Sequence, residues 1–178
     1  MIWIAPEPPS AAPAREALLD CAFGPARWQK TAERLREGRL PAVGLSFAAF
    51  DDAAGAAKLV STLRFWNVRL GNVEALLLGP VAVDGGQRGK GLGGRMIRRG
   101  LAAAAALGHR AVILVGDAPY YSRFGFAAEP AQRLRLPGPV DPRRFLALAL
   151  VPEALVRAEG AVRPTGLLAG PARHERVA

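Results

Sequence analysis

Residues 78–94 read LGPVAVDGGQRGKGLGG, an apolar segment that runs into a glycine-rich turn. Residues 96–108, MIRRGLAAAAALG, are typical of a helix. A strand, a glycine-rich turn and a helix start in this order present backbone amides to a ligand, and the helix N-terminus favours a negative charge. The stretch therefore predicts a site for the phosphates of a nucleotide-bearing cofactor.

Two cofactor patterns overlap in this turn. Gly89, Gly91 and Gly94 satisfy the G-x-G-x-x-G spacing of dinucleotide-binding proteins, and Asp117 follows at about the distance of their ribose-binding acid. Residues 88–93, RGKGLG, also fit the R-x-x-G-x-G spacing of a pyrophosphate loop seen in coenzyme A-dependent acetyltransferases. The surrounding elements have to separate the two interpretations.

The predicted element order argues against a dinucleotide fold. In that fold the glycine loop follows the first strand and opens a run of parallel units, whereas here three meander-like strands precede the loop. Lys90 lies inside the glycines, so the loop is not a Walker A sequence either. We expect strands at 1–4, 45–50, 58–68, 75–83, 111–115, around Leu134 and at 145–150, and helices at 14–22, 25–37, from the loop to Gly108 and near Tyr120.

Gly79-Pro80 interrupts the apolar strand 75–83. Proline has no N–H for a sheet and glycine weakens a strand interior, so this pair predicts a β-bulge, with a simple edge strand as the alternative. A bulge would splay this strand from 111–115 and leave backbone groups near Val81 and Val83 unpaired. The pantetheine arm of coenzyme A is an extended amide-bearing chain that can pair with such an edge.

The chain has 178 residues, with 24 Lys and Arg against 15 Asp and Glu. This length fits one domain, which we expect to span 1–160, followed by a loosely ordered tail at 161–178. Basic residues are spread over the sequence, few aromatics lie among them, and no helix-turn-helix or zinc spacing occurs, which argues against nucleic acid as the partner and against a metal site.

The apolar runs are too short to span a membrane. The N-terminus lacks a signal-peptide pattern and Cys21 has no partner for a disulfide, so we expect a cytoplasmic protein.

Several segments together resemble the GNAT superfamily of N-acetyltransferases. LGPVAVD with QRGKGLGGRMIRRGL resembles the family's fourth strand, pyrophosphate loop and third helix, and GHRAVILVGD resembles its fifth strand. YYSRFGF resembles the segment near the acceptor, and the chain most resembles a bacterial subgroup with GDxxYYxRFGF. The resemblance implies an α/β (α+β) fold: a mixed, mostly antiparallel sheet of about six or seven strands, helices on both faces, and a splay between the fourth and fifth strands.

The resemblance also implies acetyl-CoA as cofactor and direct transfer of the acetyl group to a primary amine of a small molecule or peptide. Val81 would polarise the thioester carbonyl through its backbone N–H, and Tyr121, or its neighbour Tyr120, would protonate the leaving thiolate. Glu74 is the leading candidate for the general base, while Asp117 either shares this role or caps the following helix. The cofactor-binding residues would be Val81, Ala82, Val83, Arg88, Gly89, Lys90, Gly91, Leu92, Gly93 and Gly94.

The acceptor cannot be named from the sequence. Glu33 and Glu37, on a helix expected near the acceptor pocket, could bind a cationic substrate. Homodimers are common in the family, although no interface is specified here. A catalytically silent module that binds acyl-CoA and acts as a sensor or interaction partner is the alternative, because no base stands out in the sequence.

Overall fold

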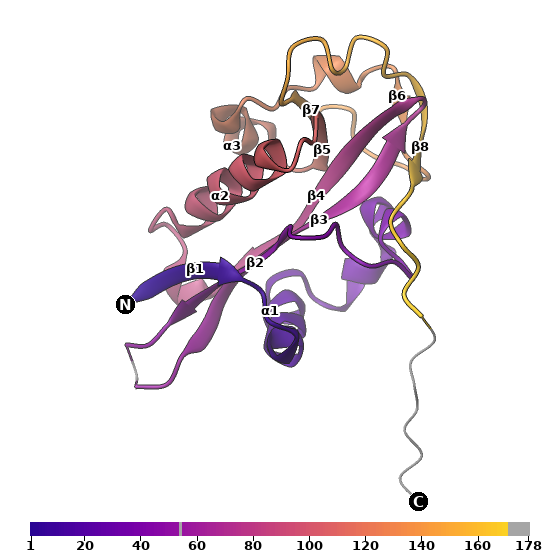
Figure 1. Cartoon of the computed structure of the whole chain (residues 1–178). Coiled ribbons are helices and arrows are strands. Elements are labelled where there is room, and N and C mark those ends of the chain that lie inside the picture. The colour runs from indigo at the N-terminus through magenta and orange to yellow at the C-terminus, as the bar shows by residue number, and fades with distance from the viewer. Residues whose placement is uncertain (54, 171–178) are drawn as a thin grey trace, which may run out of the picture.

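Among residues 1–53 and 55–170, which this computed structural model describes, eight strands form one sheet in the order β1-β2-β3-β4-β5-β7, with β8 joined to β3 and β6 (Figure 1). The mixed open sheet confirms the predicted fold, and the two-residue β6 together with β8 raises the strand number above six or seven. The strands are β1 Ile2–Pro6, β2 Ser46–Asp51, β3 Lys58–Leu70, β4 Val73–Val83, β5 Ala111–Val115, β6 Leu134–Arg135, β7 Phe145–Ala149 and β8 Gly160–Pro164. The helices are α1 Ala12–Phe23, α2 Leu92–Ala106 and α3 Ala118–Tyr121, and short 3₁₀ helices are η1 Pro9–Ala11, η2 Pro25–Gln29, η3 Thr31–Leu35, η4 Gly85–Gln87, η5 Ser122–Phe124 and η6 Glu129–Ala131.

Strands β1 to β4 form an antiparallel meander, and β5 then adds parallel to β4. A two-residue turn at Gly71-Asn72 joins β3 to β4, with Leu70 opposite Val73. Gly71 has φ 60°, the left-handed conformation that such tight turns require. This turn places the long β4 in the middle of the sheet.

Helices cover both faces of the sheet, with α2 on one side and α1 with η2 and η3 on the other (Figure 1). Side chains alternate along a strand, so Leu63 and Phe65 of β3 point to the α2 face. A Cβ atom on Gly100 of α2 would lie only 2.5 Å from Leu63 and 2.6 Å from Phe65, which shows how closely α2 approaches the sheet. The core on this face includes Phe47, Leu63, Phe65, Leu76, Met96 and Ile97.

The prediction of one continuous helix over 25–37 is wrong. Lys30 has an extended backbone conformation, φ −66° and ψ 139°, and separates η2 from η3. Two long-range hydrogen bonds explain the break: the Thr31 hydroxyl donates to the Pro139 carbonyl at 2.6 Å, and the Arg34 guanidinium donates to the Pro137 carbonyl at 2.6 Å. Tertiary contacts with the segment after β6 thus override the local helical pattern.

The prediction of a loosely ordered tail from residue 161 is also wrong for residues 161–164. Residues 160–164 form β8, which pairs with β3 at Val68–Leu70 and with β6. Strand β3 extends beyond β2 at this end, and β8 covers the edge that would otherwise be exposed. Leu168 forms a further bridge to Arg39, and the remaining predicted tail, 171–178, lies outside the described residues.

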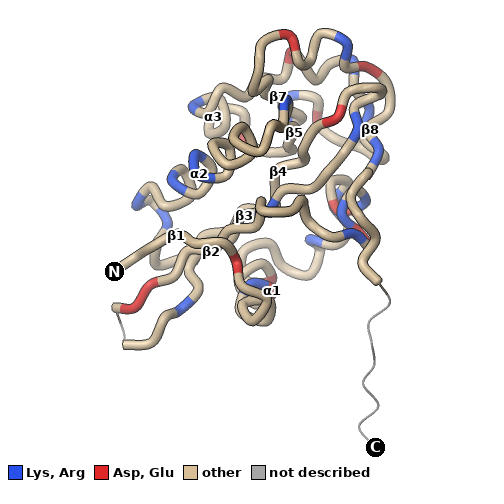
Figure 2. The backbone as a smooth tube through the Cα atoms, in the orientation of Figure 1, with Lys and Arg blue, Asp and Glu red and all other residues tan. Residues whose placement is uncertain are grey.

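Charged residues are distributed along the described part of the chain, as Figure 2 shows for Lys and Arg in blue and Asp and Glu in red. In the part of the chain that the structure describes, no helix has the length and apolar character to cross a membrane, and no cluster of three metal-ligating side chains occurs.

Candidate active site

The interruption at Gly79-Pro80 is a β-bulge, as predicted. Leu63 of β3 pairs with Val81, and Phe65 pairs with Leu78, so Gly79 and Pro80 together lie opposite the one residue between them on β3. The Gly79-Pro80 peptide bond is cis. The indole N–H of Trp66 donates to the Gly79 carbonyl at 2.6 Å and fixes the bulge from the β3 side.

Strands β4 and β5 separate beyond the bulge. In the described residues their parallel pairing covers two positions, Leu76 with Val112 and Leu77 with Ile113. Strand β4 nevertheless continues to Val83, and β5 to Val115. The predicted splay is therefore present, and the β4 edge from Val81 to Val83 borders an opening where an extended ligand can pair.

The glycine-rich turn then shapes the N-terminus of α2. Gly89 and Gly91 have φ 75° and 76°, a conformation that glycine adopts without steric cost. The first hydrogen bond of α2 runs from the Arg95 amide to the Gly91 carbonyl at 3.1 Å, so the amides of residues 92–94 precede the helical ladder and have no acceptor within it. Free amides at a helix N-terminus match a phosphate group.

Glycines keep this turn accessible. At Gly89 and Gly91 a Cβ atom would meet no described atom within 4 Å. At Gly93, in contrast, a Cβ atom would lie 2.9 Å from the Tyr120 hydroxyl and 3.5 Å from a methyl of Val83, so glycine here lets α3 and the end of β4 pack closely against the start of α2. The open turn, the free amides and the splayed edge fit a cofactor with a pyrophosphate and an extended arm.

Charged side chains flank the turn. The Arg88 guanidinium donates to the Val83 carbonyl at 3.3 Å, and Lys90 is exposed at the turn. Asp84 accepts hydrogen bonds from Lys58 and from the Gly86 amide, both at 3.0 Å, which hold the pKa of its carboxyl below the usual value. The turn therefore keeps two basic side chains beside the free amides at the start of α2.

A cavity of about 630 Å³ lies at the opening, beside the bulge. Gly79, Pro80 and Val81 form one wall, and Tyr121 lies on another. The Tyr121 ring packs against Gly116 so closely that any Cβ there would overlap it. Burial is the main cause that raises the pKa of Tyr121 to about 12, followed by the neighbouring Tyr120. The hydroxyl therefore remains protonated at neutral pH and can donate a proton.

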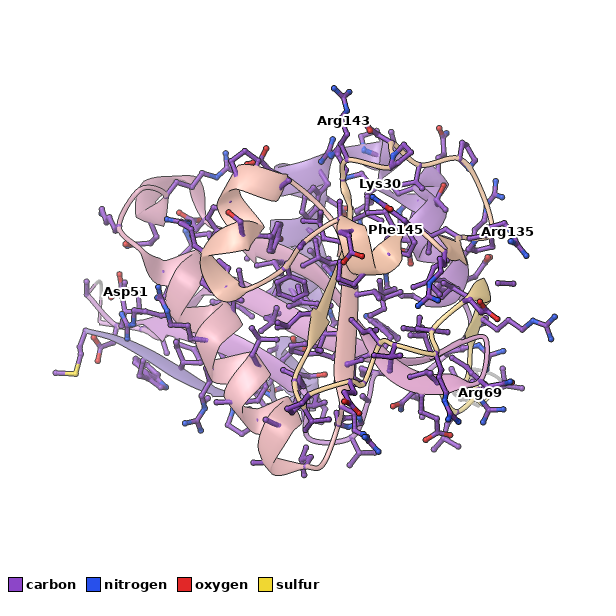
Figure 3. The ribbon with its side chains drawn as sticks, turned by 90° about the horizontal axis from the view of Figure 1, so that it is seen from above. Lys30, Asp51, Arg69, Arg135, Arg143 and Phe145 are labelled. Atoms are coloured by element: carbon purple, nitrogen blue, oxygen red, sulfur yellow. The ribbon has the colours of Figure 1, made fainter. Side chains whose placement is uncertain are left out.

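Glu74 is not part of this arrangement. It lies at the start of β4, five residues before Gly79, which is roughly 16 Å along an extended strand. Its carboxylate is largely exposed, pairs with Arg69 at 3.2 Å, and borders a different cavity together with His109. Figure 3 shows Arg69 well away from Lys30, a residue of the bulge-side cavity. The prediction of Glu74 as the general base is therefore wrong, because the alternation and direction of β4 carry it away from the opening.

The three other predicted acids, Glu33, Glu37 and Asp117, lie in or beside the bulge-side cavity. Glu33 lines the bulge-side cavity and pairs with Arg36 at 3.3 Å. Glu37 lines a smaller adjoining cavity of about 330 Å³. Asp117 lies in the bulge-side cavity and caps α3, since it accepts a hydrogen bond from the Tyr120 amide at 3.1 Å.

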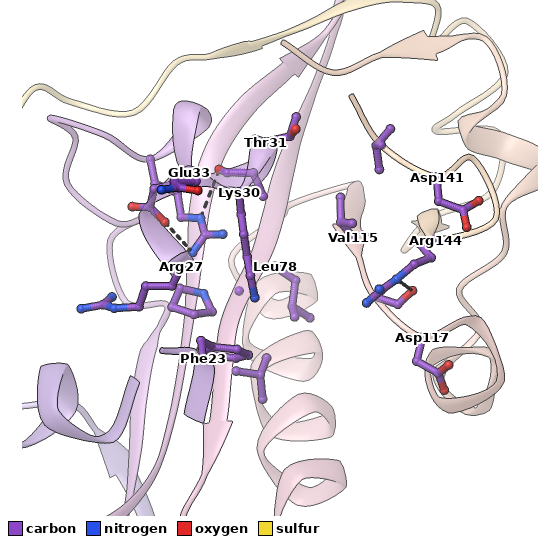
Figure 4. A pocket seen from close by; sticks show the side chains of 18 of the residues that line it. Phe23, Arg27, Lys30, Thr31, Glu33, Leu78, Val115, Asp117, Asp141 and Arg144 are labelled. Carbon is purple, nitrogen blue, oxygen red and sulfur yellow. Dashed lines mark hydrogen bonds and ion pairs between the residues drawn. The ribbon is translucent and has the colours of Figure 1, made fainter. Parts of the chain in front are cut away.

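Sequence reasoning missed Lys30 and Arg144, which enter the same cavity from opposite walls (Figure 4). Lys30 lies over the Phe23 ring at 4.3 Å, and burial, followed by the charges of Arg36 and Arg144, lowers its pKa. The Arg144 guanidinium donates to the Gly116 carbonyl at 3.3 Å. No local pattern marks either residue, since they come together only through the fold.

The sequence was compared with known proteins. A family model described as an acetyltransferase (GNAT) domain matches residues 15–128. The chain belongs to the GNAT acetyltransferase family. This membership confirms the predicted superfamily and the predicted acyltransferase class. The GNAT chain is also 35% identical over 136 residues to YhbS of Escherichia coli strain K12, named an uncharacterized N-acetyltransferase, and the match covers 74% of this chain and 78% of YhbS.

Two solved structures resemble this GNAT chain over nearly its whole length. Escherichia coli YhbS in complex with CoA superimposes with a TM-score of 0.77 at 30% identity, covering 92% of this chain and 89% of YhbS. A GNAT family acetyltransferase from Brucella melitensis in complex with acetyl-CoA superimposes with a TM-score of 0.64 at 29% identity, covering 97% of both chains. Both relatives were therefore solved with the cofactor, or its product form, that the sequence predicts for this chain.

Proposed function

We propose that this protein is an N-acetyltransferase that takes an acetyl group from acetyl-CoA and transfers it directly to a primary amine of a small molecule or peptide. The observation that carries the proposal is the cavity where the β4 bulge, the splayed β4 edge and the buried Tyr121 meet. The CoA complexes of YhbS and of the Brucella protein support the same cofactor here.

Cofactor binding is assigned to the predicted residues in two groups. The backbone of Val81, Ala82 and Val83 would pair with the pantetheine arm along the splayed edge. The amides of residues 89–94 would bind the pyrophosphate, with Arg88 and Lys90 adding positive charge. Acetyl-CoA, when bound in this way, supplies an activated acetyl thioester at the bulge.

Residues of the cavity would then carry out the transfer. The backbone N–H of Val81 donates to the thioester carbonyl oxygen and stabilises the negative charge that develops there. The amine nitrogen forms a bond to the carbonyl carbon, and the bond from carbon to sulfur breaks, with its electron pair going to sulfur. The Tyr121 hydroxyl gives its proton to that sulfur and regains one from the new amide nitrogen, so the enzyme ends in its starting state.

An incoming ammonium group must first lose a proton. Of the carboxylates that line the cavity, Glu33 pairs with Arg36 and Asp141 pairs with Arg143. Within the described residues, Asp117 is held by a backbone amide and has no arginine ion partner. We assign the attraction and deprotonation of the amine to Asp117 in place of Glu74.

A thiol-release assay with a panel of primary amines tests this function. Tyr121→Phe removes only the hydroxyl, so we expect kcat to fall by about 10²- to 10⁴-fold, the usual contribution of general acid catalysis, with acetyl-CoA affinity nearly unchanged. Because the pKa of Tyr121 is raised to about 12, kcat for the wild type should show no basic limb below about pH 10.

Tyr120→Phe is the matched control, since it removes the neighbouring hydroxyl near Gly93. A larger loss of kcat in Tyr120→Phe than in Tyr121→Phe would transfer the role to Tyr120. Acetyl-CoA binding by calorimetry without thiol release for any amine would favour the alternative, a silent acyl-CoA-binding module.

A further inference from the structure

We infer that the acceptor is a small primary amine that also carries an anionic group, a carboxylate or a phosphate, and that Lys30 and Arg144 bind this group. The inference rests on the proposed function and names the substrate class of the same cavity. It reverses the expectation that Glu33 and Glu37 recruit a purely cationic acceptor.

The charge pairing in the cavity carries the inference. Arg27 is satisfied by Glu16 at 2.6 Å and Asp20 at 2.8 Å, and Arg36 is paired with Glu33. In the described residues, neither Lys30 nor Arg144 has a carboxylate within ion-pair distance. The cavity therefore contains two cations that no described carboxylate contacts directly.

Lys30 and Arg144 are also positioned toward the same space. In Figure 4, Lys30 extends from the η2–η3 junction toward Leu78 of β4, and Arg144 approaches from the opposite wall, next to Asp117. The extended conformation of Lys30, which breaks the predicted helix, is what directs this side chain into the cavity. The hydrogen bond from Arg144 Nε to the Gly116 carbonyl fixes its guanidinium while other N–H groups of the fork remain for a ligand.

The cofactor phosphates do not account for these cations. The pyrophosphate site is built by residues 88–94, which follow the end of β4, and these residues do not line the cavity. Lys30 and Arg144 instead share the cavity with Gly79, Pro80 and Val81, where the thioester would lie. A ligand that is held there is the acceptor.

Asp117 completes a bipolar site. Its carboxylate lies on the same wall as Arg144, so one molecule can present its amine to Asp117 and Tyr121 and its anionic group to the two cations. An isolated cationic amine would gain nothing from Lys30 and Arg144 and would be repelled by them. Arginine suits a planar carboxylate or a phosphate through paired hydrogen bonds, and the lysine adds a point charge.

The test uses matched pairs of amines that differ in one anionic group: glycine against glycinamide, and phosphoethanolamine against ethanolamine. In the pair with the larger difference, we expect kcat/KM for the amine with the anionic group to exceed that of the amine without it by about 10- to 100-fold, the usual effect of a charge-assisted hydrogen bond. The pair that shows the larger ratio distinguishes carboxylate from phosphate. In Lys30→Gln/Arg144→Gln this ratio should fall to near one.

Arg135→Gln is the control. It removes the same charge from an exposed residue of β6 that does not line the cavity and points away from the protein in Figure 3. The selectivity ratio should therefore persist in this variant. A ratio near one in the wild type, or one that persists in the double variant, overturns the inference while leaving the acetyltransferase function in place.

Binding of the anionic group is measured separately, so that the anion site is tested even if no amine of the panel supports thiol release. N-acetylglycine and O-phospho-N-acetylethanolamine, as product probes, are titrated calorimetrically into the wild type and the double variant in the presence of CoA. We expect the affinity to fall by about tenfold or more in the double variant, again by loss of charge-assisted contacts. Absence of thiol release for every amine would contradict the proposed function. Equal probe binding by the wild type and the double variant would contradict the anion site.

Discussion

Helix α2 and the α1–η3 segment are attached to opposite faces of the same sheet by different interactions. Helix α2 packs through apolar side chains and the close contact of Gly100 with Leu63 and Phe65. On the other face, Leu18 and Leu19 of α1 form an apolar cluster with Leu59 of β3. Ion pairs are added there: Glu7, whose side chain is 2% exposed, pairs with Arg15 of α1 and with Arg64 of β3, and Glu16 joins α1 to Arg27 of η2. The α2 side thus depends on backbone and packing, whereas the α1 side combines packing with networks of specific charges.

The Glu7 cluster gives the largest expected effect. Glu7→Gln keeps the shape of the side chain but removes the counter-charge of Arg64 and leaves Arg15 with only the partly exposed Glu16. Breaking a buried ion pair from one side usually costs about 3–5 kcal/mol, so we expect the free energy of unfolding to fall by that amount in urea titrations. A loss below about 1 kcal/mol would show that the α1 face is held by packing, as α2 is.

The same contrast explains what the sequence could predict. The bulge, the loop and the start of α2 are formed by residues 78–95, one continuous stretch in which glycine and proline restrict the backbone, so the local pattern was sufficient. The bulge-side cavity combines residues from α1, η2, η3, β4, β5, α3 and the 139–144 segment. Its composition depends on where these segments meet.

Three particular failures have this origin. The 25–37 segment was predicted as one helix because its own pattern is helical, but Thr31 and Arg34 bind carbonyls more than 100 residues away. Strand β8 was missed because the unpaired edge of β3 that it covers is a property of the sheet. Glu74 was chosen for its place on the bulged strand, although the direction of β4 sends it to the opposite end.

A substitution at Gly93 tests the backbone-built side and is expected to have the next largest effect. Gly93→Val places a branched side chain where it overlaps the Tyr120 hydroxyl and meets Val83, so the start of α2, whose amides we assign to the pyrophosphate, has to shift. Loss of one to two charge-assisted hydrogen bonds should weaken acetyl-CoA binding by about 100-fold, measured by calorimetry.

Gly170→Val is the control for this substitution, because a Cβ atom there meets no atom within 4 Å and the backbone is not left-handed. Its acetyl-CoA affinity should equal that of the wild type. If Gly93→Val also retained wild-type affinity, the phosphates would have to be held by Arg88 and Lys90 alone, and the two sides of the sheet would both rely on side-chain charge.

The smallest expected effect concerns Glu74, whose ion pair lies on the surface. The Glu74 carboxylate is 82% exposed and its partner Arg69 is 50% exposed, so solvent screens their attraction. Glu74→Gln should therefore change the free energy of unfolding by less than about 1 kcal/mol and leave kcat, KM and the pH profile of thiol release as in the wild type. A fall in kcat of tenfold or more, with a shifted acidic limb, would instead require Glu74 to act on the amine across the length of β4. In that case the charge-built acceptor side would extend to the second cavity, where Glu74 lies with His109.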